Sequence, residues 1–349
     1  MAQPNGWLQL APPVLTLGLL IGVAAVFGNP TPTRSQAKRT VRLAYFPNLT
    51  HAPAVVGVAR GLFQRALPAG VGVDPKVFNA GPEEMEALLA GEVDLGYVGP
   101  SPAINTYVKS GGKGVRILAG ACSGGAALVA RPTSGVSRIE DLAGKRVAIP
   151  QLGGTQDVSL RHFLARAGLR SLDKGGNVEI LPIKNPDILA LLRRGELDAA
   201  WVPEPWAARL IAETGARLVL DERDLWPQRR FTTTVLVART AFLEREPELV
   251  RAILRAHLDG VNWLVRHPAE GRGVVNAELK RLTGKALPDE VLADAWKRLD
   301  FTADPNRPSV EAFVRAAAAA GYLPSTTPNI AAMFAAPPMD DVRAMRGTP

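Results

Sequence analysis

Small or polar residues follow several apolar segments of the chain, at points where a strand would give way to a helix. They are Asn48 and His51, Gly99, Pro100 and Ser101, Ser123 and Gly124, Gly154, Thr155 and Gln156, and Trp201 with Glu204. The first backbone N–H groups of a helix have no partner within that helix, so such positions attract anions. We therefore expect this set to hold a small oxyanion through N–H groups and hydroxyls.

Typical interaction energies allow such a site to work without an arginine. Micromolar affinity requires roughly 8 kcal/mol. A partly buried helix end contributes up to about 2 kcal/mol, and each hydrogen bond to a charged group about 1.5–3 kcal/mol. Two or three helix ends, together with Ser101, Ser123 and Thr155, reach that sum before the cost of ordering the site.

Several of these residues also have a structural interpretation. Gly153 and Gly154 are equally typical of a turn, Asp157 of a helix cap, and Trp201 of a core; these alternatives stay open. The four histidines show no i, i+4 pair, and Cys122 is the one cysteine, so no zinc site or disulfide framework is predicted. Without a recognisable nucleophile motif, P-loop or dinucleotide fingerprint, we expect a binding protein without a cofactor rather than an enzyme.

Two stretches that would position these residues resemble each other. Gly91–Thr106 contains an apolar segment followed by Gly-Pro-Ser-Pro and then a helical pattern from Ala103. Ala190–Trp206 contains a similar segment followed by Pro-Glu-Pro. Each is preceded by a helical pattern that opens with proline and acidic residues and ends at a glycine. The repetition indicates two similar lobes.

Strand patterns alternate with helical patterns along the chain, which predicts a mostly parallel α/β architecture. Strands are expected near residues 40–45, 73–78, 95–98, 116–121, 146–149, 179–182, 198–202, 217–220 and 232–239. Helices are expected over 206–214 and 247–266, among others. Ala127–Arg131 and Thr232–Arg239 share Leu-Val-Ala-Arg and are expected to pair as the strands through which the chain crosses between lobes. This assigns 41–131 and 232–323 to lobe 1, 132–231 to lobe 2, and 324–349 to a loose tail.

Composition and the amino-terminal region limit the class of protein. The 349 residues are 47% hydrophobic and 21% charged, as in a globular protein, and the net charge of +8 is scattered, so nucleic-acid binding is not expected. Residues 14–27 form an uncharged apolar run of signal-peptide length, followed by a polar spacer to residue 40. No basic residue precedes this run, so a cleaved signal peptide and an uncleaved membrane anchor both remain open.

Four blocks of the sequence resemble one protein family. They are Tyr45–Asn48 with His51-Ala52-Pro53, Asp94 through Tyr97–Ala103, Pro150–Gly153 with Thr155–Asp157, and Pro203–Trp206. In this order they are similar to the extracytoplasmic substrate-binding proteins of ABC importers in the aliphatic sulfonate, taurine and nitrate class. The resemblance runs from about residue 41 to 323.

The resemblance implies a type II periplasmic-binding-protein fold, in which two lobes joined by a hinge of two crossing segments close on a solute. It implies a periplasmic or extracytoplasmic monomer that delivers a small anion, an alkanesulfonate in first place, to a membrane permease. Glu204 leaves room for a solute that also carries an amine, such as taurine. Nitrate, bicarbonate, a thiamine precursor and riboflavin are alternative solutes. An enzyme of the same fold, a pyrimidine-precursor synthase or a menaquinone-pathway dehydratase, is the rival interpretation.

Overall fold

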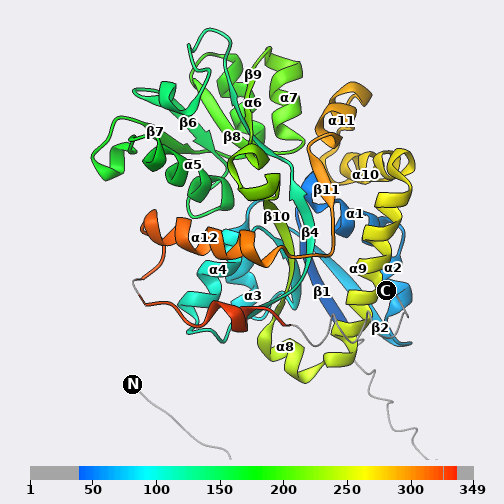
Figure 1. Ribbon diagram of the computed structural model, residues 1–349. Coiled ribbons are helices and arrows are strands. Elements are labelled where there is room, and N and C mark those ends of the chain that lie inside the picture. Colours follow the sequence, from blue (N-terminus) through cyan, green and yellow to red (C-terminus); the bar gives the residue numbers. More distant parts are fainter. Residues whose placement is uncertain (1–38, 325, 336–349) are drawn as a thin grey trace, which may run out of the picture. The chain divides into compact units, whose positions relative to one another are not determined.

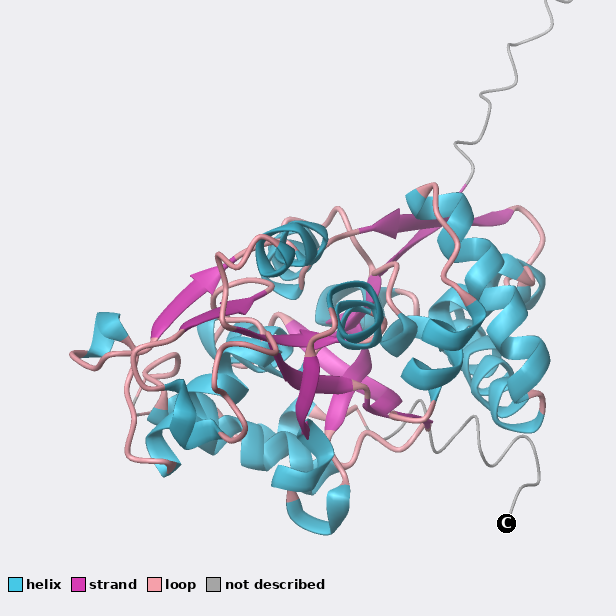
Figure 2. Cartoon of the chain, turned by 90° about the horizontal axis from the view of Figure 1, so that it is seen from above, coloured by secondary structure: helices cyan, strands magenta, loops and turns pink. Residues whose placement is uncertain are grey.

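The computed structural model describes residues 39–324 and 326–335. The predicted signal or anchor segment and the end of the predicted tail lie outside this range. Two β-sheets form the framework of the described residues, with helices on both sides of the strands (Figures 1 and 2).

The first sheet has six strands in the order β11-β4-β10-β3-β1-β2. Their bounds are β1 (Arg39–Tyr45), β2 (Val71–Val77), β3 (Leu95–Val98), β4 (Val115–Gly124), β10 (Thr232–Arg239) and β11 (Leu299–Phe301). β1 runs parallel to β2 and β3, whereas β10 pairs antiparallel with β3 and β4, and β11 pairs antiparallel with β4. The sheet is therefore parallel at one edge and antiparallel at the other.

The second sheet has five strands in the order β7-β6-β8-β5-β9. They are β5 (Ala126–Ala130), β6 (Arg146–Ile149), β7 (Glu179–Pro182), β8 (Ala199–Pro203) and β9 (Arg217–Asp221). β6 is parallel to β7 and β8, and β5 is antiparallel to β8 and β9. Four of the nine pairings between these strands are parallel, so the sheets are mixed where the sequence predicted mostly parallel ones.

The helices divide between the two sheets. On the first-sheet side lie α1 (Ala52–Ala59), α2 (Leu62–Ala66), α3 (Gly81–Leu89), α4 (Pro100–Lys109), α8 (Thr240–Arg245), α9 (Pro247–Arg266), α10 (Pro268–Thr283) and α11 (Asp289–Trp296). On the second-sheet side lie α5 (Thr155–Arg166), α6 (Asn185–Arg193) and α7 (Trp206–Thr214). Helix α12 (Arg307–Ala319) packs against both α4 and α5, and α11 packs against both α10 and α7, so these two helices contact both sides (Figure 1).

The chain passes between the sheets at two neighbouring places. Outward it leaves β4 at Gly124 and enters β5 at Ala126, and on its return it reaches β10 after Phe231. The Gly124 N–H donates to the Phe231 carbonyl at 2.8 Å. The expected pairing of Ala127–Arg131 with Thr232–Arg239 was wrong, because β5 pairs only within the second sheet and β10 only within the first. The lobe boundaries stay a prediction, and below we refer to the first-sheet and second-sheet sides.

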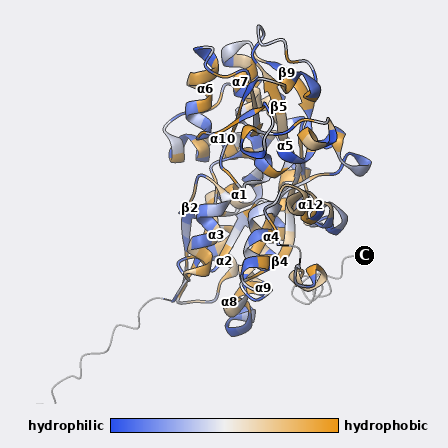
Figure 3. Cartoon of the chain, turned by 90° about the vertical axis from the view of Figure 1, so that its left-hand side faces the viewer, coloured by the Kyte–Doolittle hydropathy of each residue, from blue (hydrophilic) through white to orange (hydrophobic). Residues whose placement is uncertain are grey.

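Alternating strand residues separate the hydrophobic cores. Leu43 and Tyr45 of β1 face a core shared with α1, α9 and α10, whereas Ala44 faces a second core. This second core continues from the first sheet to Leu128 of the second sheet. A third core lies between the opposite face of the second sheet and helices α6 and α7, whose surfaces carry hydrophobic and hydrophilic residues side by side (Figure 3).

The first part of the predicted tail is packed against the first sheet. Ile330–Met333 form a short 3-10 helix, and the Met333 side chain is fully buried. The Ala335 N–H donates to the Ile117 carbonyl at 2.9 Å. The proline-rich composition suggested a loose segment, but the two apolar side chains Met333 and Phe334 belong to the second core or pack against it.

Candidate functional site

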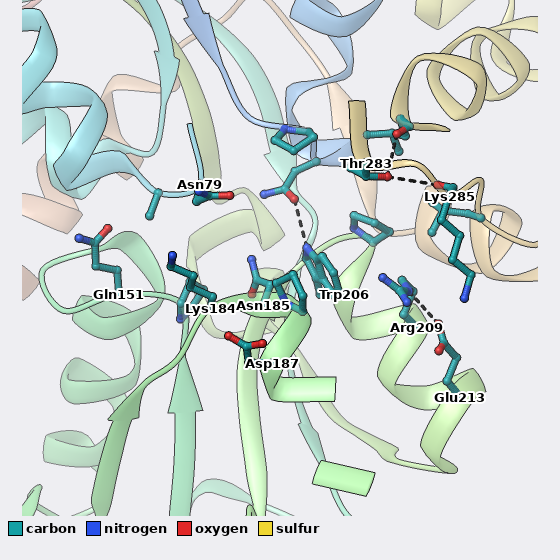
Figure 4. A pocket seen from close by; sticks show the side chains of 18 of the residues that line it. Asn79, Gln151, Lys184, Asn185, Asp187, Trp206, Arg209, Glu213, Thr283 and Lys285 are labelled. Carbon is teal, nitrogen blue, oxygen red and sulfur yellow. Dashed lines mark hydrogen bonds and ion pairs between the residues drawn. The ribbon is translucent and has the colours of Figure 1, made fainter. Parts of the chain in front are cut away.

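Two connected cavities lie between the first-sheet and second-sheet sides. The inner cavity has a volume of about 50 Å³ and the outer cleft about 870 Å³. Asn48, Asn79 and Ala80 of the first-sheet side and Pro150, Gln151 and Asn185 of the second-sheet side line both. Figure 4 shows the outer cleft, with Asn79, Thr283 and Lys285 across from Gln151, Asn185 and Trp206.

The amino-terminal ends of five helices contribute residues to the inner cavity. His51 precedes α1, Gly81 begins α3, Gly99 precedes α4, Thr155 begins α5 and Asn185 begins α6. No side chain within the described part of the chain caps any of these five ends. The amino-terminal end of a helix carries partial positive charge because its first N–H groups are unpaired. The inner cavity therefore favours an anion.

Local sequence explains why these helices begin at the cavity. Four of the five, α1, α3, α4 and α6, have proline in the first two helical positions. Proline fits there because its φ angle is already helical and its missing N–H would have had no partner. At the fifth, Gly154 precedes Thr155 in extended conformation.

The side chains that line the inner cavity are neutral. Among the described residues, none of those lining it is Asp, Glu, Lys or Arg. Burial lowers the pKa of His51 to about 3, so its ring is neutral at physiological pH. The His51 Nδ1 atom accepts from the Phe46 N–H at 3.2 Å, which places the proton of the neutral ring on Nε2.

Three polar atoms at the inner cavity are buried without a hydrogen-bond partner in the described structure. They are Thr155 Oγ1, Asn185 Oδ1 and Thr234 Oγ1, on residues that line the cavity. The Thr155 and Thr234 side chains come from opposite sides, from α5 and β10. A buried polar group without a partner costs about 1–3 kcal/mol, so these atoms would gain from a polar solute.

The two sides touch directly around the inner cavity. A Cβ atom placed on Gly99 would lie 2.1 Å from Thr155 Oγ1, so only glycine allows this approach. The Ser101 hydroxyl donates to the Gly153 carbonyl at 3.1 Å. Trp206 Nε1 donates to Asn48 Oδ1 at 3.2 Å, the contact drawn as a dashed line in Figure 4. These contacts join the two sides across the cavity.

The structure brings six of the twelve predicted site residues together at the inner cavity. They are Asn48, His51, Gly99, Gly154, Thr155 and Gln156. Their contact with a solute stays a prediction. Asn48 keeps its amide NH₂ group available, because its Oδ1 atom accepts from Trp206.

Four further predicted residues lie nearby without lining the cavity. Pro100 and Ser101 are buried in the first turn of α4. Ser123 and Gly124 end β4 where the chain crosses between the sheets. The Ser123 hydroxyl accepts from the Phe231 N–H at 3.3 Å, so it belongs to the crossing rather than to the cavity.

The remaining two, Trp201 and Glu204, are engaged in buried contacts elsewhere. Trp201 is fully buried, and its Nε1 atom donates to Glu222 Oε2 at 2.7 Å. Glu204 is fully buried, and its Oε1 atom accepts from Arg298 Nε at 2.5 Å. Their position after a strand suggested a solute contact, but the structure turns both side chains into the interior of the protein.

Sequence reasoning missed other residues that line the inner cavity. Among them are Asn185, Thr233 and Thr234. Asn185-Pro186 opens a helix just as Gly81-Pro82 does, and this shared start was a usable signal. Thr233 and Thr234 lie within a strand pattern, so only the placement of β10 in the first sheet brings them to the cavity.

The described residues offer neither a metal centre nor a membrane span. No group of three or more His, Cys, Asp and Glu side chains in the described ranges is arranged to hold a metal ion. No helix within residues 39–324 and 326–335 is both long and apolar enough to cross a membrane.

The sequence profile of the NMT1-like family matches residues 34–277. The taurine-binding periplasmic protein of Escherichia coli is 32% identical over 218 residues, covering 62% of this chain and 64% of that protein. The match therefore spans a little under two thirds of the length of this relative.

Solved structures share the fold. The alkanesulfonate-binding protein SsuA from Xanthomonas axonopodis pv. citri, bound to MOPS, has a TM-score of 0.70 at 20% identity, covering 84% of this chain and 97% of that one. The periplasmic nitrate-binding protein NrtA from Synechocystis has a TM-score of 0.71 at 15% identity, covering 90% of each chain. These likenesses confirm the predicted two-lobed periplasmic-binding-protein class of fold.

Proposed function

Because the chain belongs to the NMT1-like family, we propose that it is the solute-binding component of an ABC importer and captures a small sulfonate. The observation that carries this proposal is the convergence of five uncapped helix ends on a neutral inner cavity. Such a site holds a permanently ionised anion without a counter-charged side chain. The sulfonate head would accept hydrogen bonds from the helix N–H groups and from Thr155 and Thr234.

The relatives support a binding role rather than catalysis. The E. coli relative and both structural neighbours are binding proteins by name. By the same likeness we propose that the chain acts outside the cytoplasm, as a monomer, and delivers its solute to a membrane permease. In this proposal the two sides separate to admit the solute and close again through the contacts at Gly99, Ser101 and Trp206.

Calorimetry and thermal-shift measurements on the purified protein test the sulfonate proposal. The panel contains ethanesulfonate, benzenesulfonate, taurine, nitrate, bicarbonate, riboflavin and a thiamine precursor. We expect a sulfonate to bind with a Kd in the micromolar range or below and to raise the melting temperature, since a ligand that binds only the folded state stabilises it. Absence of binding by every sulfonate would contradict the proposal.

Nitrate is the second candidate, because the inner cavity of about 50 Å³ is small enough to enclose a compact anion completely. The same panel separates the two. Binding of nitrate without any sulfonate would keep the anion site but exclude the sulfonate. Binding of riboflavin alone would contradict the proposal that the inner cavity binds an anion.

A further inference from the structure

The outer cleft is open to the inner cavity and is much larger. Asn48, Asn79, Pro150, Gln151 and Asn185 line both spaces, so a solute held in one extends directly into the other. A cavity of roughly 10–15 Å³ is enough to hold one water molecule. The inner volume of about 50 Å³ therefore suits an anionic head of a few atoms. Any substituent on that head must lie in the outer cleft.

The wall of the outer cleft combines apolar with polar residues, and its charges are balanced. Six prolines and Leu287 line it, and Trp206 contributes an aromatic ring that is partly exposed. Its charged side chains are three basic and three acidic residues: Lys184, Arg209 and Lys285, with Glu83, Asp187 and Glu213. Arg209 and Glu213 pair with each other at 2.7 Å. A cleft without an excess of either charge favours a neutral substituent.

The surroundings of the anionic head give no partner for an ammonium group. No acidic side chain lines the inner cavity among the described residues, and the carboxylate of Glu204 is paired with Arg298. The amine of taurine is only two carbons from its sulfonate, so it would lie where the two spaces meet. The described residues that line both spaces include no carboxylate, and Glu83, Asp187 and Glu213 line the outer cleft alone, so the lost hydration of the amine would not be compensated there. The chain should therefore bind taurine less well than a sulfonate with an apolar substituent.

We infer that the solute is a sulfonate with a neutral apolar or aromatic substituent, and that Trp206 is the residue that selects it. This inference rests on the proposed function. Trp206 lines the outer cleft directly beside Asn48, to which its indole N–H donates at 3.2 Å. Arg209 lies 4.6 Å from the centre of the indole ring and fixes its orientation. Contact of an apolar substituent with this ring removes area from water on both.

Calorimetry with ethanesulfonate, taurine, benzenesulfonate and naphthalene-2-sulfonate tests the inference. We expect affinity to rise from taurine through ethanesulfonate and benzenesulfonate to naphthalene-2-sulfonate. Trp206→Ala should weaken naphthalene-2-sulfonate about tenfold or more, as for loss of roughly 1.4 kcal/mol, and ethanesulfonate less. Trp206→Phe, which removes the hydrogen bond to Asn48 but keeps an aromatic face, should retain most of the preference.

Trp263→Ala is the matched control, because Trp263 lies on α9 and does not line the cleft. It should leave the order of affinities unchanged. The inference is overturned if taurine binds as tightly as benzenesulfonate, or if Trp206→Ala and Trp206→Phe weaken all sulfonates equally. Those results leave the proposed function standing, whereas failure of every sulfonate to bind removes both.

Discussion

At the scale of single residues, Thr155 is the side chain best placed to bind an anion. Its hydroxyl is buried and finds no hydrogen-bond partner among the residues that the structure describes. It lies at the first position of α5, in contact with the opposite side. The sequence analysis predicted that the hydroxyls of both Thr155 and Ser101 bind the anion. The structure separates them, because the Ser101 hydroxyl already donates to the Gly153 carbonyl.

Thr155→Val should weaken sulfonate binding by about 1.5–3 kcal/mol, because a hydrogen bond to a charged group is lost while the volume of the side chain is kept. Calorimetry measures the change in Kd. Thr214→Val is the control, since the Thr214 hydroxyl donates to the Leu210 carbonyl on α7, away from the inner cavity. Equal affinities for Thr155→Val and the parent protein would place the anion elsewhere.

Glu204→Gln should lower the free energy of unfolding by about 1.5–3 kcal/mol, because the buried Arg298 loses a charged hydrogen-bond partner and keeps its ion pair with Asp294. Urea denaturation measures this. The matched control is Glu213→Gln on α7, whose pair with Arg209 is partly exposed and should contribute about 0–1 kcal/mol. A Glu204→Gln protein of unchanged stability but reduced affinity would restore Glu204 as a solute contact.

At the scale of elements, strands and helices follow the sequence closely where the pattern is local. β3, β6, β7, β10, α7 and α9 have the bounds that hydrophobic periodicity predicted. Helix starts were less well predicted: α4 was expected from Ala103 but begins at Pro100. Proline interrupts a helical sequence pattern and so suggests that the helix begins after it, yet proline is stable in the first turn of a helix. This error moved the cavity-facing helix end by one turn.

Gly99→Ala should hold the two sides apart, because its Cβ would lie 2.1 Å from Thr155 Oγ1. We expect weaker binding of every sulfonate in the panel and a larger radius of gyration with solute, measured by small-angle X-ray scattering. Gly273→Ala in α10 is the control, since no atom lies within 4 Å of the added Cβ. The prediction fails if both variants bind alike.

At the scale of the whole molecule, the sequence indicated two similar units but not how they join. The Leu-Val-Ala-Arg repeat suggested a pair of crossing strands, whereas β5 and β10 belong to different sheets. Pairing across a long stretch of chain leaves no periodic signal in either strand. For the same reason, the sequence did not predict that Trp201 bonds to Glu222 and Glu204 to Arg298, because each partner comes from a distant segment.

The free energy of unfolding should depend on pH through two buried side chains, His257 and Glu222, whose effects are opposite. Burial lowers the pKa of His257 to about 4 and raises that of Glu222 to about 7. The unfolded chain takes up a proton on His257 below pH 6.5, so this contribution to stability is lost as pH falls from about 6.5 to 4. Glu222 acts in reverse: its contribution is present at low pH and is lost as pH rises from about 4.5 to 7.

Urea denaturation from pH 4.5 to 6.5 distinguishes the two contributions. Relative to the parent protein, His257→Gln should gain and Glu222→Gln should lose free energy of unfolding as pH falls, each by roughly 1.4 kcal/mol per pH unit. Thr214→Val provides the control, because it removes no titratable group, and its curve should run parallel to that of the parent protein. If the free energy of unfolding depended on pH in the same way in all variants, the pKa shifts of His257 and Glu222 would be contradicted.

The hydrogen bond from Trp206 to Asn48 gives the protein an intrinsic optical reporter of closure. The indole of Trp206 belongs to the second-sheet side, and its N–H partner belongs to the first. When the two sides separate, water replaces the amide and the fluorescence emission of Trp206 should shift to longer wavelength. Stopped-flow fluorescence of the unlabelled protein should then follow opening and closing in real time, and this signal should vanish in Trp206→Phe.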